Sequence, residues 1–458
     1  MDFTVFDLLM DVGMISVLLI IGTFMRRHFE WFRNLLIPAP ITAGLLALIF
    51  GPEVLGWLPF SGALGDYSTL LIAVVFASMP YSMSFASNDA SKAKNMWGFS
   101  TSMFLGQWGL FILLGIFIFG PIFDTPEWFG MMLPVGFVGG FGTAAAVGGA
   151  FGDHGADAAM SLGFTSATVG TLAAIIGGII FANWGIRTGR TSTLPEKLPW
   201  ELRSGHIEDE EKQPSIGRAT TNPSSIEPLA LHAGFIAVTV MFAYIGQQII
   251  GHFFPDVSVP LFALAFVVGI GGKVFLHVIR RPKYLDQQTV KSISGASTDF
   301  MIAFGIASIK PDAVANYLVP LLILFVLGIA YCCLFFFVFA PMFFGDQWLE
   351  RGIFGWGWAT AAVATGIALL KIVDPDLKSG TMNEYGIAYV GFAPFEIGMN
   401  IVAPIAVIAG LAWGIGGLRR WQRLRSSDLR RCGVGSQKEQ EGVPAKLPRW
   451  HKSKAHKQ

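Results

Sequence analysis

Charged residues are scarce in this chain: they make up 14% of its 458 residues, whereas hydrophobic residues make up 53%. Soluble domains carry roughly 25% charged residues, so a soluble globule fits poorly. The 32 Lys and Arg nearly balance the 31 Asp and Glu, which excludes an overall field that would attract nucleic acid. The mean hydropathy of +0.56 indicates a membrane protein.

Cysteine is scarce as well. Of the three cysteines, Cys332 and Cys333 are adjacent in an apolar run, and Cys432 lies in a basic tail. This spacing fits neither a disulfide framework nor a zinc knuckle. The sequence also lacks residues at metal-ligand spacing, so we expect no resident metal and no other cofactor.

Motifs for nucleotide-driven or enzymatic chemistry are lacking too. The segment Gly271-Gly272-Lys273 is followed by Val274, so it is not a Walker A motif and coupling to ATP is not expected. The apolar runs contain no paired base and nucleophile, which argues against an enzyme. Residues 1–11 carry acids but no Lys or Arg, so the first apolar run is expected to stay as a span and not to be cleaved as a signal peptide.

Long apolar runs are what the chain has in abundance. Ten of them are expected to cross a hydrocarbon core about 30 Å thick. They are Val12–Met25, Ile37–Leu58, Tyr67–Phe85, Met96–Phe119, Ala158–Trp184, Leu229–His252, Val257–His277, Val290–Ile309, Tyr317–Phe344 and Tyr385–Gly416. We therefore expect an all-α polytopic membrane protein with about ten transmembrane helices.

Two further apolar runs, residues 131–152 and 353–372, are crowded with Gly, Ala and Thr. Small residues leave backbone groups exposed. At membrane depth, exposed backbone survives only where protein or a water-filled cavity satisfies it. We interpret both runs as re-entrant hairpins, each entering and leaving on one face of the membrane.

The basic loops set the expected orientation. If both hairpins are re-entrant and the N-terminus is outside, the loops at Arg26, Lys92, Arg187 and Arg280 all lie inside the cell. Counting the first hairpin as a full crossing would place Arg187 outside. The basic tail that begins at Arg419 is then outside, against the rule. The expected location is the inner (cell) membrane, as a multi-pass protein.

Hydrophilic segments divide the chain. Residues 188–228 include the charged stretch 208–212 and have too little apolar content to pack, so we expect a cytoplasmic linker. This linker would join an N-terminal membrane repeat, 1–187, to a C-terminal inverted repeat, 229–418. Residues 419–458 are typical of a basic disordered tail.

An internal repeat supports this division. Three short segments recur in the same order in both halves. The pairs are 37–40 with 257–260, 142–147 with 359–364, and 162–170 with 390–398. Because each half has five crossings, the second copy would be inverted relative to the first. Inverted repeats with interrupted helices are typical of alternating-access transporters.

These segments resemble the sodium/glutamate symporter family over about the first 420 residues. The resemblance is carried by Ile37–Pro40, Gly44–Leu46, Gly139–Thr143, Gly163–Gly170 and Ala359–Ala361. In that family the Gly-Gly-x-Gly-Thr segments form re-entrant loops between the fourth and fifth spans of each half. The chain departs from the pattern at Phe141, where the family typically has His. Its second loop, Gly355–Thr360, is more aromatic and lacks the family's Pro.

The resemblance implies sodium-coupled symport of glutamate or a related carboxylate-bearing solute, by alternating access of the elevator type. It also implies a homodimer in which a scaffold portion supports a moving transport portion. The expected partners are a small anionic or zwitterionic solute, the lipid bilayer and a second copy of the chain. Nucleic acid is not expected. Sodium would be the coupling ion.

The two hairpins are the candidate substrate site. Backbone N–H groups at the N-terminus of a half-helix carry partial positive charge, and glycine lets a carboxylate come close to them. The predicted substrate contacts are Gly140, Phe141, Gly142 and Thr143 in the first hairpin, and Trp358, Ala359 and Thr360 in the second. The alternative is that these small residues serve helix packing.

Oxygen-bearing side chains supply the candidate ion site. Thr165, Ser166 and Thr168 cluster within about one turn, although such hydroxyls also bond the carbonyl of the preceding turn. Glu396 lies within the last span, and Asn400 follows at i+4 on the same helix face. An ionisable group at this depth is by default functional, while a protonated structural carboxyl is the alternative.

Three other functions stay open at this stage. A proton-coupled organic anion transporter would share this architecture. An ion channel could use the same hairpins as a filter. An intramembrane enzyme fits least, because the spans lack a base and nucleophile pair.

Overall fold

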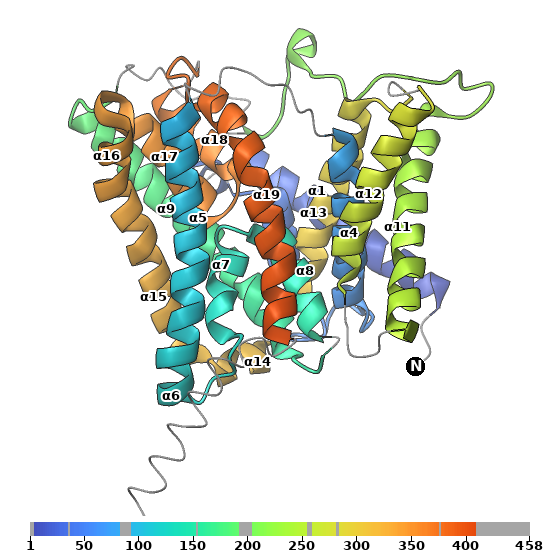
Figure 1. The fold of residues 1–458 in the computed structure, drawn as a ribbon, viewed down its shortest axis with the longest axis horizontal. Helices are drawn as coiled ribbons and strands as arrows, with labels where there is room; N and C mark the ends of the chain where they lie inside the picture. The colour runs from blue at the N-terminus through green and yellow to red at the C-terminus, as the bar shows by residue number, and fades with distance from the viewer. Residues whose placement is uncertain are drawn as a thin grey trace, which may run out of the picture. The chain divides into compact units, whose positions relative to one another are not determined.

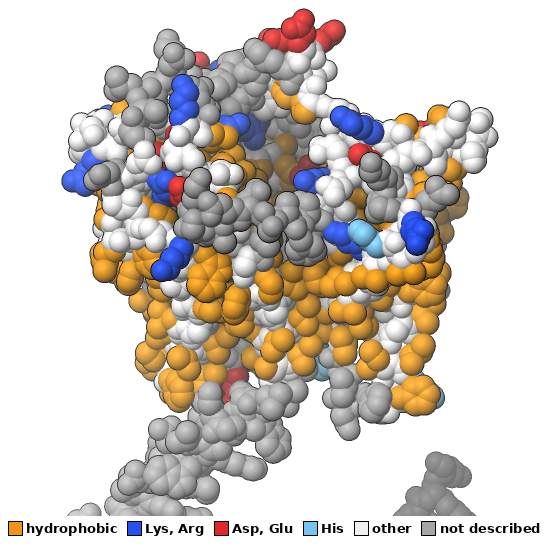
Figure 2. Space-filling model, turned by 45° about the horizontal axis from the view of Figure 1, so that its top comes forward, with side chains coloured by type: hydrophobic (Ala, Val, Ile, Leu, Met, Phe, Trp, Pro, Cys, Tyr) orange, Lys and Arg blue, Asp and Glu red, His pale blue; other side chains and the backbone are white. Residues whose placement is uncertain are grey.

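The computed structural model describes residues 4–34, 37–82, 93–152, 154–191, 204–253, 259–280, 284–374 and 377–408 (Figure 1). Within these residues every regular element is helical. Seven helices are long and apolar enough to cross a membrane, and α19 makes an eighth if its two bent parts form one span. Figure 2 shows a broad hydrophobic band, with Lys and Arg side chains gathered above it. The all-α, polytopic expectation is therefore confirmed.

The seven spanning helices coincide with seven of the ten expected runs. They are α1 (Val5–His28), α4 (Leu64–Ser82), α5 with its continuation (Lys94–Phe123), α9 (Ala158–Arg187), α11 (Pro228–Phe253), α12 (Leu261–Val278) and α15 with its continuation (Leu318–Phe344).

The other three expected spans are less regular. At 1.5 Å per residue, the 12 residues of α3 (Ala39–Phe50) extend only about 18 Å. α13 (Gln287–Ala307) holds several Ser and Thr side chains and is not among the seven. α19 (Thr381–Ile408) is bent by 59° between Tyr389 and Gly391. The count of ten crossings thus stays a prediction.

Shorter helices complete the described residues. They are α2 (Glu30–Asn34), α6 (Gly120–Phe123), α7 (Met132–Gly136), α8 (Gly140–Gly152), α14 (Pro311–Asn316), α16 (Ala340–Phe344), α17 (Trp348–Thr360) and α18 (Val363–Val373), with 3₁₀ turns η3 (Phe129–Met131), η4 (Glu210–Lys212) and η6 (Gly345–Gln347).

The membrane helices pack as two bundles (Figure 1). The first bundle consists of α1, α3, α4, α11, α12 and α13; the second consists of α5, α7, α8, α9, α15, α17, α18 and α19. The second bundle has an aromatic core, in which Trp108, Trp356 and Trp358 are completely buried. The bundles meet where α4 and α13 contact α8. Both halves of the chain contribute to each bundle and belong to one compact unit, Met1–Ala409.

Several features occur once in each half. α3 and α12 each follow an extended proline, Pro38 (ψ 137°) and Pro260 (ψ 140°). α5 passes into a five-residue π-helical turn, η2 (Gly115–Phe119), and α15 passes into another, η5 (Phe335–Phe339). A short helix with proline in its first turn follows each π turn.

The described part of the linker lies against one end of the first bundle. Arg218 N–H donates to Asp286 Oδ2 at 3.1 Å, and the Ser292 hydroxyl donates to the Ile216 carbonyl at 2.7 Å. Burial alone would raise the pKa of the Asp286 carboxyl, but hydrogen bonds from Thr289 and Arg218 outweigh it and lower that pKa. The linker thus contacts the bundle through polar groups, consistent with its low apolar content. Its boundaries stay predictions, and the predicted tail, 419–458, lies outside the described residues.

Candidate functional site

Both predicted hairpins contain a helix break. In the first, α7 ends at Gly136 and α8 begins at Gly140, which has a φ of +64° that glycine adopts readily. Because this backbone angle is not helical, we call residues 137–140 the first break. In the second hairpin, α17 ends at Thr360 and α18 begins at Val363. The second break is therefore Ala361 and Ala362, both with extended φ angles (−149° and −166°). Each hairpin thus has a half-helix that starts inside the protein.

The two breaks touch. A Cβ atom on Gly140 would lie 2.8 Å from the Ala361 carbonyl oxygen, closer than real Cβ atoms come. α9 passes beside the contact, since a Cβ on Gly170 would collide with the Thr360 carbonyl oxygen and with the Phe137 ring. Glycine at both positions therefore lets three backbone segments from distant parts of the sequence meet at one point.

Gln107 of α5 connects the two breaks. Its side chain is fully buried, its Oε1 accepts a hydrogen bond from Val138 N–H at 3.3 Å, and its Nε2 donates to the Ala359 carbonyl at 3.3 Å. Nε2 also lies 3.4 Å from Cys332 Sγ. Because buried backbone groups in broken helices need partners, this one amide satisfies a donor of the first break and an acceptor beside the second.

The N-terminus of α8 offers backbone donors in accessible space. The first N–H groups of a helix have no partner within the helix. Gly142, in this turn, is only half-buried, and a Cβ built on it would meet a single neighbour, Ile72 Cδ1 at 3.3 Å. Phe141 and Thr143 are both buried, and the Phe141 ring centroid lies 6.4 Å from that of Phe164. Of the four predicted residues in this hairpin, Gly142 is thus the one with open space beside its backbone.

In the second hairpin, the backbone N–H groups that begin a helix belong to other residues than predicted. Trp358, Ala359 and Thr360 are buried at the carbonyl end of α17, so their backbone does not present N–H groups of a helix start. Trp358 packs edge-on against Phe392 at 5.4 Å, and the Thr360 hydroxyl donates to the Trp356 carbonyl at 2.6 Å. The helix start belongs to α18, where Ala362 and Ala364 are exposed. The prediction placed the donors a few residues too early, because the sequence does not show on which side of the break each half-helix lies.

The hydroxyl groups of α9 bond carbonyls of α9 itself or of the adjacent α7. Thr165 and Thr168 donate to the Ser161 and Phe164 carbonyls at 2.7 and 2.8 Å, which is the bond to the preceding turn that was weighed as the alternative. Ser166 instead reaches the Leu133 carbonyl of α7 at 3.5 Å. These hydroxyls keep free lone pairs, so their role as ion ligands stays a prediction.

Glu396 and Asn400 form a buried polar patch on α19. The Glu396 Oε2 and the Asn400 Oδ1 are inaccessible to solvent and have no hydrogen-bond partner among the described residues, and the same holds for the Tyr385 hydroxyl. Tyr389 reaches the Glu396 carboxyl. Unsatisfied buried oxygens are costly and call for an explanation such as a bound ion or proton.

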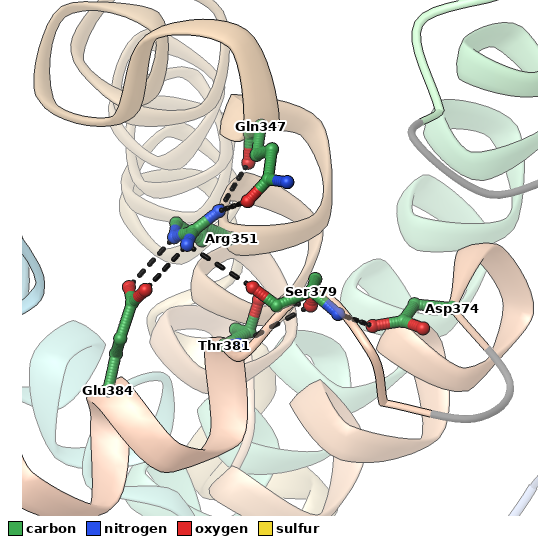
Figure 3. A network of polar contacts seen from close by, with 6 residues as sticks. All are labelled: Gln347, Arg351, Asp374, Ser379, Thr381 and Glu384. Carbon is green, nitrogen blue, oxygen red and sulfur yellow. Dashed lines mark hydrogen bonds and ion pairs between the residues drawn. The ribbon is translucent and has the colours of Figure 1, made fainter.

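A second polar network connects the two ends of the second hairpin (Figure 3). Arg351 of α17 forms a bidentate ion pair with Glu384 of α19, with Nε to Oε2 at 2.8 Å and Nη2 to Oε1 at 2.6 Å. Its Nη2 also donates to the Ser379 carbonyl, and Asp374 accepts from Ser379 N–H. The network therefore ties both ends of the hairpin to the start of α19.

Sequence reasoning missed Gln107 and Arg351. Gln107 is an amide within the apolar run 96–119, and Arg351 lies two residues before the apolar run 353–372. A polar side chain inside a span was the available signal for Gln107, whereas Arg351 lies outside every predicted span and hairpin.

A comparison with protein families places these features in context. The family model described as "Sodium/glutamate symporter" matches residues 4–348, well over half of the chain. The match includes the first break and α9 and ends at the first residue of α17. No curated protein matches the chain.

Proposed function

Because the chain belongs to the sodium/glutamate symporter family, we propose that it is a sodium-coupled symporter of glutamate or a related carboxylate-bearing solute. The observation that carries this proposal is the meeting of two helix breaks at Gly140 and Ala361. Such a junction offers helix starts to an anion and helix ends to a cation within one site, which is the arrangement of broken helices in secondary transporters.

The substrate carboxylate binds at the helix starts in this proposal. The N-terminus of α8 at Gly142 and that of α18 at Ala364 each carry about half a positive elementary charge. Two such ends compensate a carboxylate without a buried cation, which would be expensive at this depth. Gly140, Phe141 and Thr143 shape the first helix start, while Trp358, Ala359 and Thr360 hold the second break in place.

The coupling ion binds where oxygen atoms remain unsatisfied. Glu396 Oε2 and Asn400 Oδ1 supply one carboxylate and one amide oxygen, and both suit a hard cation. Thr165, Ser166 and Thr168 are further oxygen ligands beside the first break. A proton on Glu396 would satisfy the same carboxyl, so proton-coupled transport of an organic anion is the second candidate.

Alternating access in this proposal uses the two bundles. The first bundle acts as the scaffold and the second, which contains both breaks, moves as an elevator. The π turns and proline-led helices that occur once in each half support an inverted repeat. The hairpins 131–152 and 353–372 are re-entrant from opposite faces. The protein forms a homodimer in the inner (cell) membrane.

Uptake into proteoliposomes tests the function. Labelled glutamate, other dicarboxylates and neutral amino acids are offered with a sodium gradient or a proton gradient, imposed separately. Saturable uptake of a carboxylate-bearing solute driven by sodium alone is expected. Uptake driven by protons alone would select the second candidate, and unsaturable flux far above carrier rates would indicate a channel.

Cysteine labelling tests the topology. Single cysteines replacing Lys94, Arg187 and Arg280 are expected to react with an impermeant reagent from the cytoplasmic side only. Labelling of the cysteine at 187 from outside would refute the re-entrant first hairpin.

A further inference from the structure

A groove separates α12 of the first bundle from α19 of the second. It has a volume of about 870 Å³, within the range of about 300–1,000 Å³ that is typical of ligand pockets. Its lining comes from α4, α12 and α19, including Gly398, and is apolar except at Lys273 and His277. It shares no lining residue with the helix breaks, so it is separate from the proposed substrate site.

The groove opens on the lipid-facing surface. Ile270, Val274 and Val278, on successive turns of α12, are 44%, 55% and 73% exposed. Exposed aliphatic side chains on a membrane helix face acyl chains. On the opposite wall a Cβ built on Gly398 would meet nothing within 4 Å, so this part of the groove is open space. Acyl chains can therefore enter the groove from the side.

Basic side chains lie toward one end. Lys273 and His277 are at i and i+4 on α12, so they share one face of the helix. Lys273 lies about 8 Å from the C-terminus of α12, within reach of a lysine side chain that extends toward the membrane surface. None of the described residues that line the groove is acidic.

We propose that this groove binds a phospholipid with an anionic headgroup. The acyl chains lie along α12 and α19, and the phosphate lies beside Lys273 and His277. Basic pockets between transmembrane helices on the cytoplasmic side are where anionic lipids are recognised. The lipid would thus fill the space between the scaffold and the moving bundle.

The charge pattern favours a lipid over a protein segment. The basic side chains lie at one end of an otherwise apolar groove, so one localised negative charge is enough to meet them. A phospholipid supplies that charge on its phosphate and has flexible acyl chains for the apolar part.

Lipid retention by the full-length protein tests the proposal without measuring transport. The protein is equilibrated in nanodiscs of phosphatidylglycerol or phosphatidylcholine, released into detergent and weighed by native mass spectrometry. One tightly retained phosphatidylglycerol per chain is expected. Lys273→Gln is expected to weaken its retention about fivefold, from about 1 kcal/mol per cationic side chain near the surface. Lys291→Gln, an exposed lysine of α13 outside the groove, serves as the matched control and should retain the lipid.

A second pair of variants tests the apolar part. Gly398→Leu fills the open space and is expected to abolish retention of the lipid. Gly386→Leu is the control, because a Cβ there also meets nothing within 4 Å but Gly386 does not line the groove. Equal retention of both lipids by the wild type, or unchanged retention in Lys273→Gln, would overturn the proposal. If the wild type retains no lipid and forms an oligomer that dissociates in Gly398→Leu, a second copy of the chain occupies the groove instead.

Discussion

Gly140 and Ala361 approach so closely that a Cβ on Gly140 would lie 2.8 Å from the Ala361 carbonyl oxygen. Gly140 belongs to the first hairpin and Ala361 to the second, so this contact couples the position of one half-helix to that of the other. Neither hairpin can shift along its axis without opening the junction. The contact thus makes the two breaks one site.

Gly140→Ala should therefore destabilise the junction. Its φ of +64° costs a residue with a Cβ about 1–2 kcal/mol, and the collision with Ala361 adds to this. We expect a lower unfolding temperature in detergent and reduced uptake. Gly152→Ala, at the far end of α8, adds a Cβ where nothing lies within 4 Å and should leave both unchanged. An unaltered unfolding temperature in Gly140→Ala would show that the contact is not tight.

Gly142→Val should weaken substrate binding while the protein stays folded. The branched side chain would enter the space in which the carboxylate meets the backbone of α8. We expect at least a tenfold loss of apparent affinity, about 1.4 kcal/mol, in uptake titrations. Gly142→Ala should have an intermediate effect, because its only new neighbour is the end of the Ile72 side chain. Wild-type affinity in the valine variant would place the carboxylate elsewhere.

Gln107→Leu should destabilise the protein because it leaves Val138 N–H and the Ala359 carbonyl buried without a partner. Each such group costs about 1–3 kcal/mol. We expect a lower unfolding temperature and a loss of uptake. Gln247→Leu removes a bond to the Val259 carbonyl in the first bundle and should leave uptake intact. Normal uptake by Gln107→Leu would show that the amide is not needed to hold the two helix breaks together.

Glu396→Gln should remove the coupling of uptake to sodium without disturbing the packing of the side chain. The substitution keeps the shape and hydrogen-bonding capacity of the side chain and removes the charge that would meet a cation. We expect a folded protein that still binds substrate but whose uptake no longer rises with sodium. Glu227→Gln, an exposed residue before α11, is the control. Retained sodium dependence in Glu396→Gln would direct the search to Thr143, Thr168 and Thr360.

The Arg351–Glu384 ion pair should contribute measurably to stability. Arg351→Gln leaves a partly buried carboxylate, and we expect a cost of roughly 2 kcal/mol, less than the 3–5 kcal/mol for a fully buried pair because the Glu384 side chain is 23% exposed. Chemical unfolding of the two single variants and the double variant with Glu384→Gln gives the coupling energy. Additive effects would show that the pair does not interact.

The sequence predicted the parts of the site that depend on composition. Small residues at 131–152 and 353–372 indicated helix breaks, and the structure has a break in each segment. The position of Trp358 relative to the second break was not predictable, because both sides of that break consist of similar small and apolar residues. Whether a residue lies before or after a break decides whether it presents a carbonyl or an N–H group.

Side-chain contacts between distant segments could not be predicted from the sequence either. Nothing in the run 96–119 shows that Gln107 faces two breaks, since this depends on how α5 packs against both hairpins. Glu396, by contrast, was proposed from depth alone. The structure gives its Oε2 no partner among the described residues, and its role stays a prediction. An isolated charge in an apolar run is a strong signal, whereas an amide is a weak one.

The two π-helical turns bear on the origin of the molecule. A π turn accommodates one additional residue, which in an α-helix would rotate everything beyond it by about 100°. η2 and η5 occupy the same place in their halves, each directly before a proline-led short helix. Two independent insertions at matching points would be a coincidence. Under the inverted repeat proposed above, one ancestral half-protein would have carried the insertion and passed it to both descendants by gene duplication.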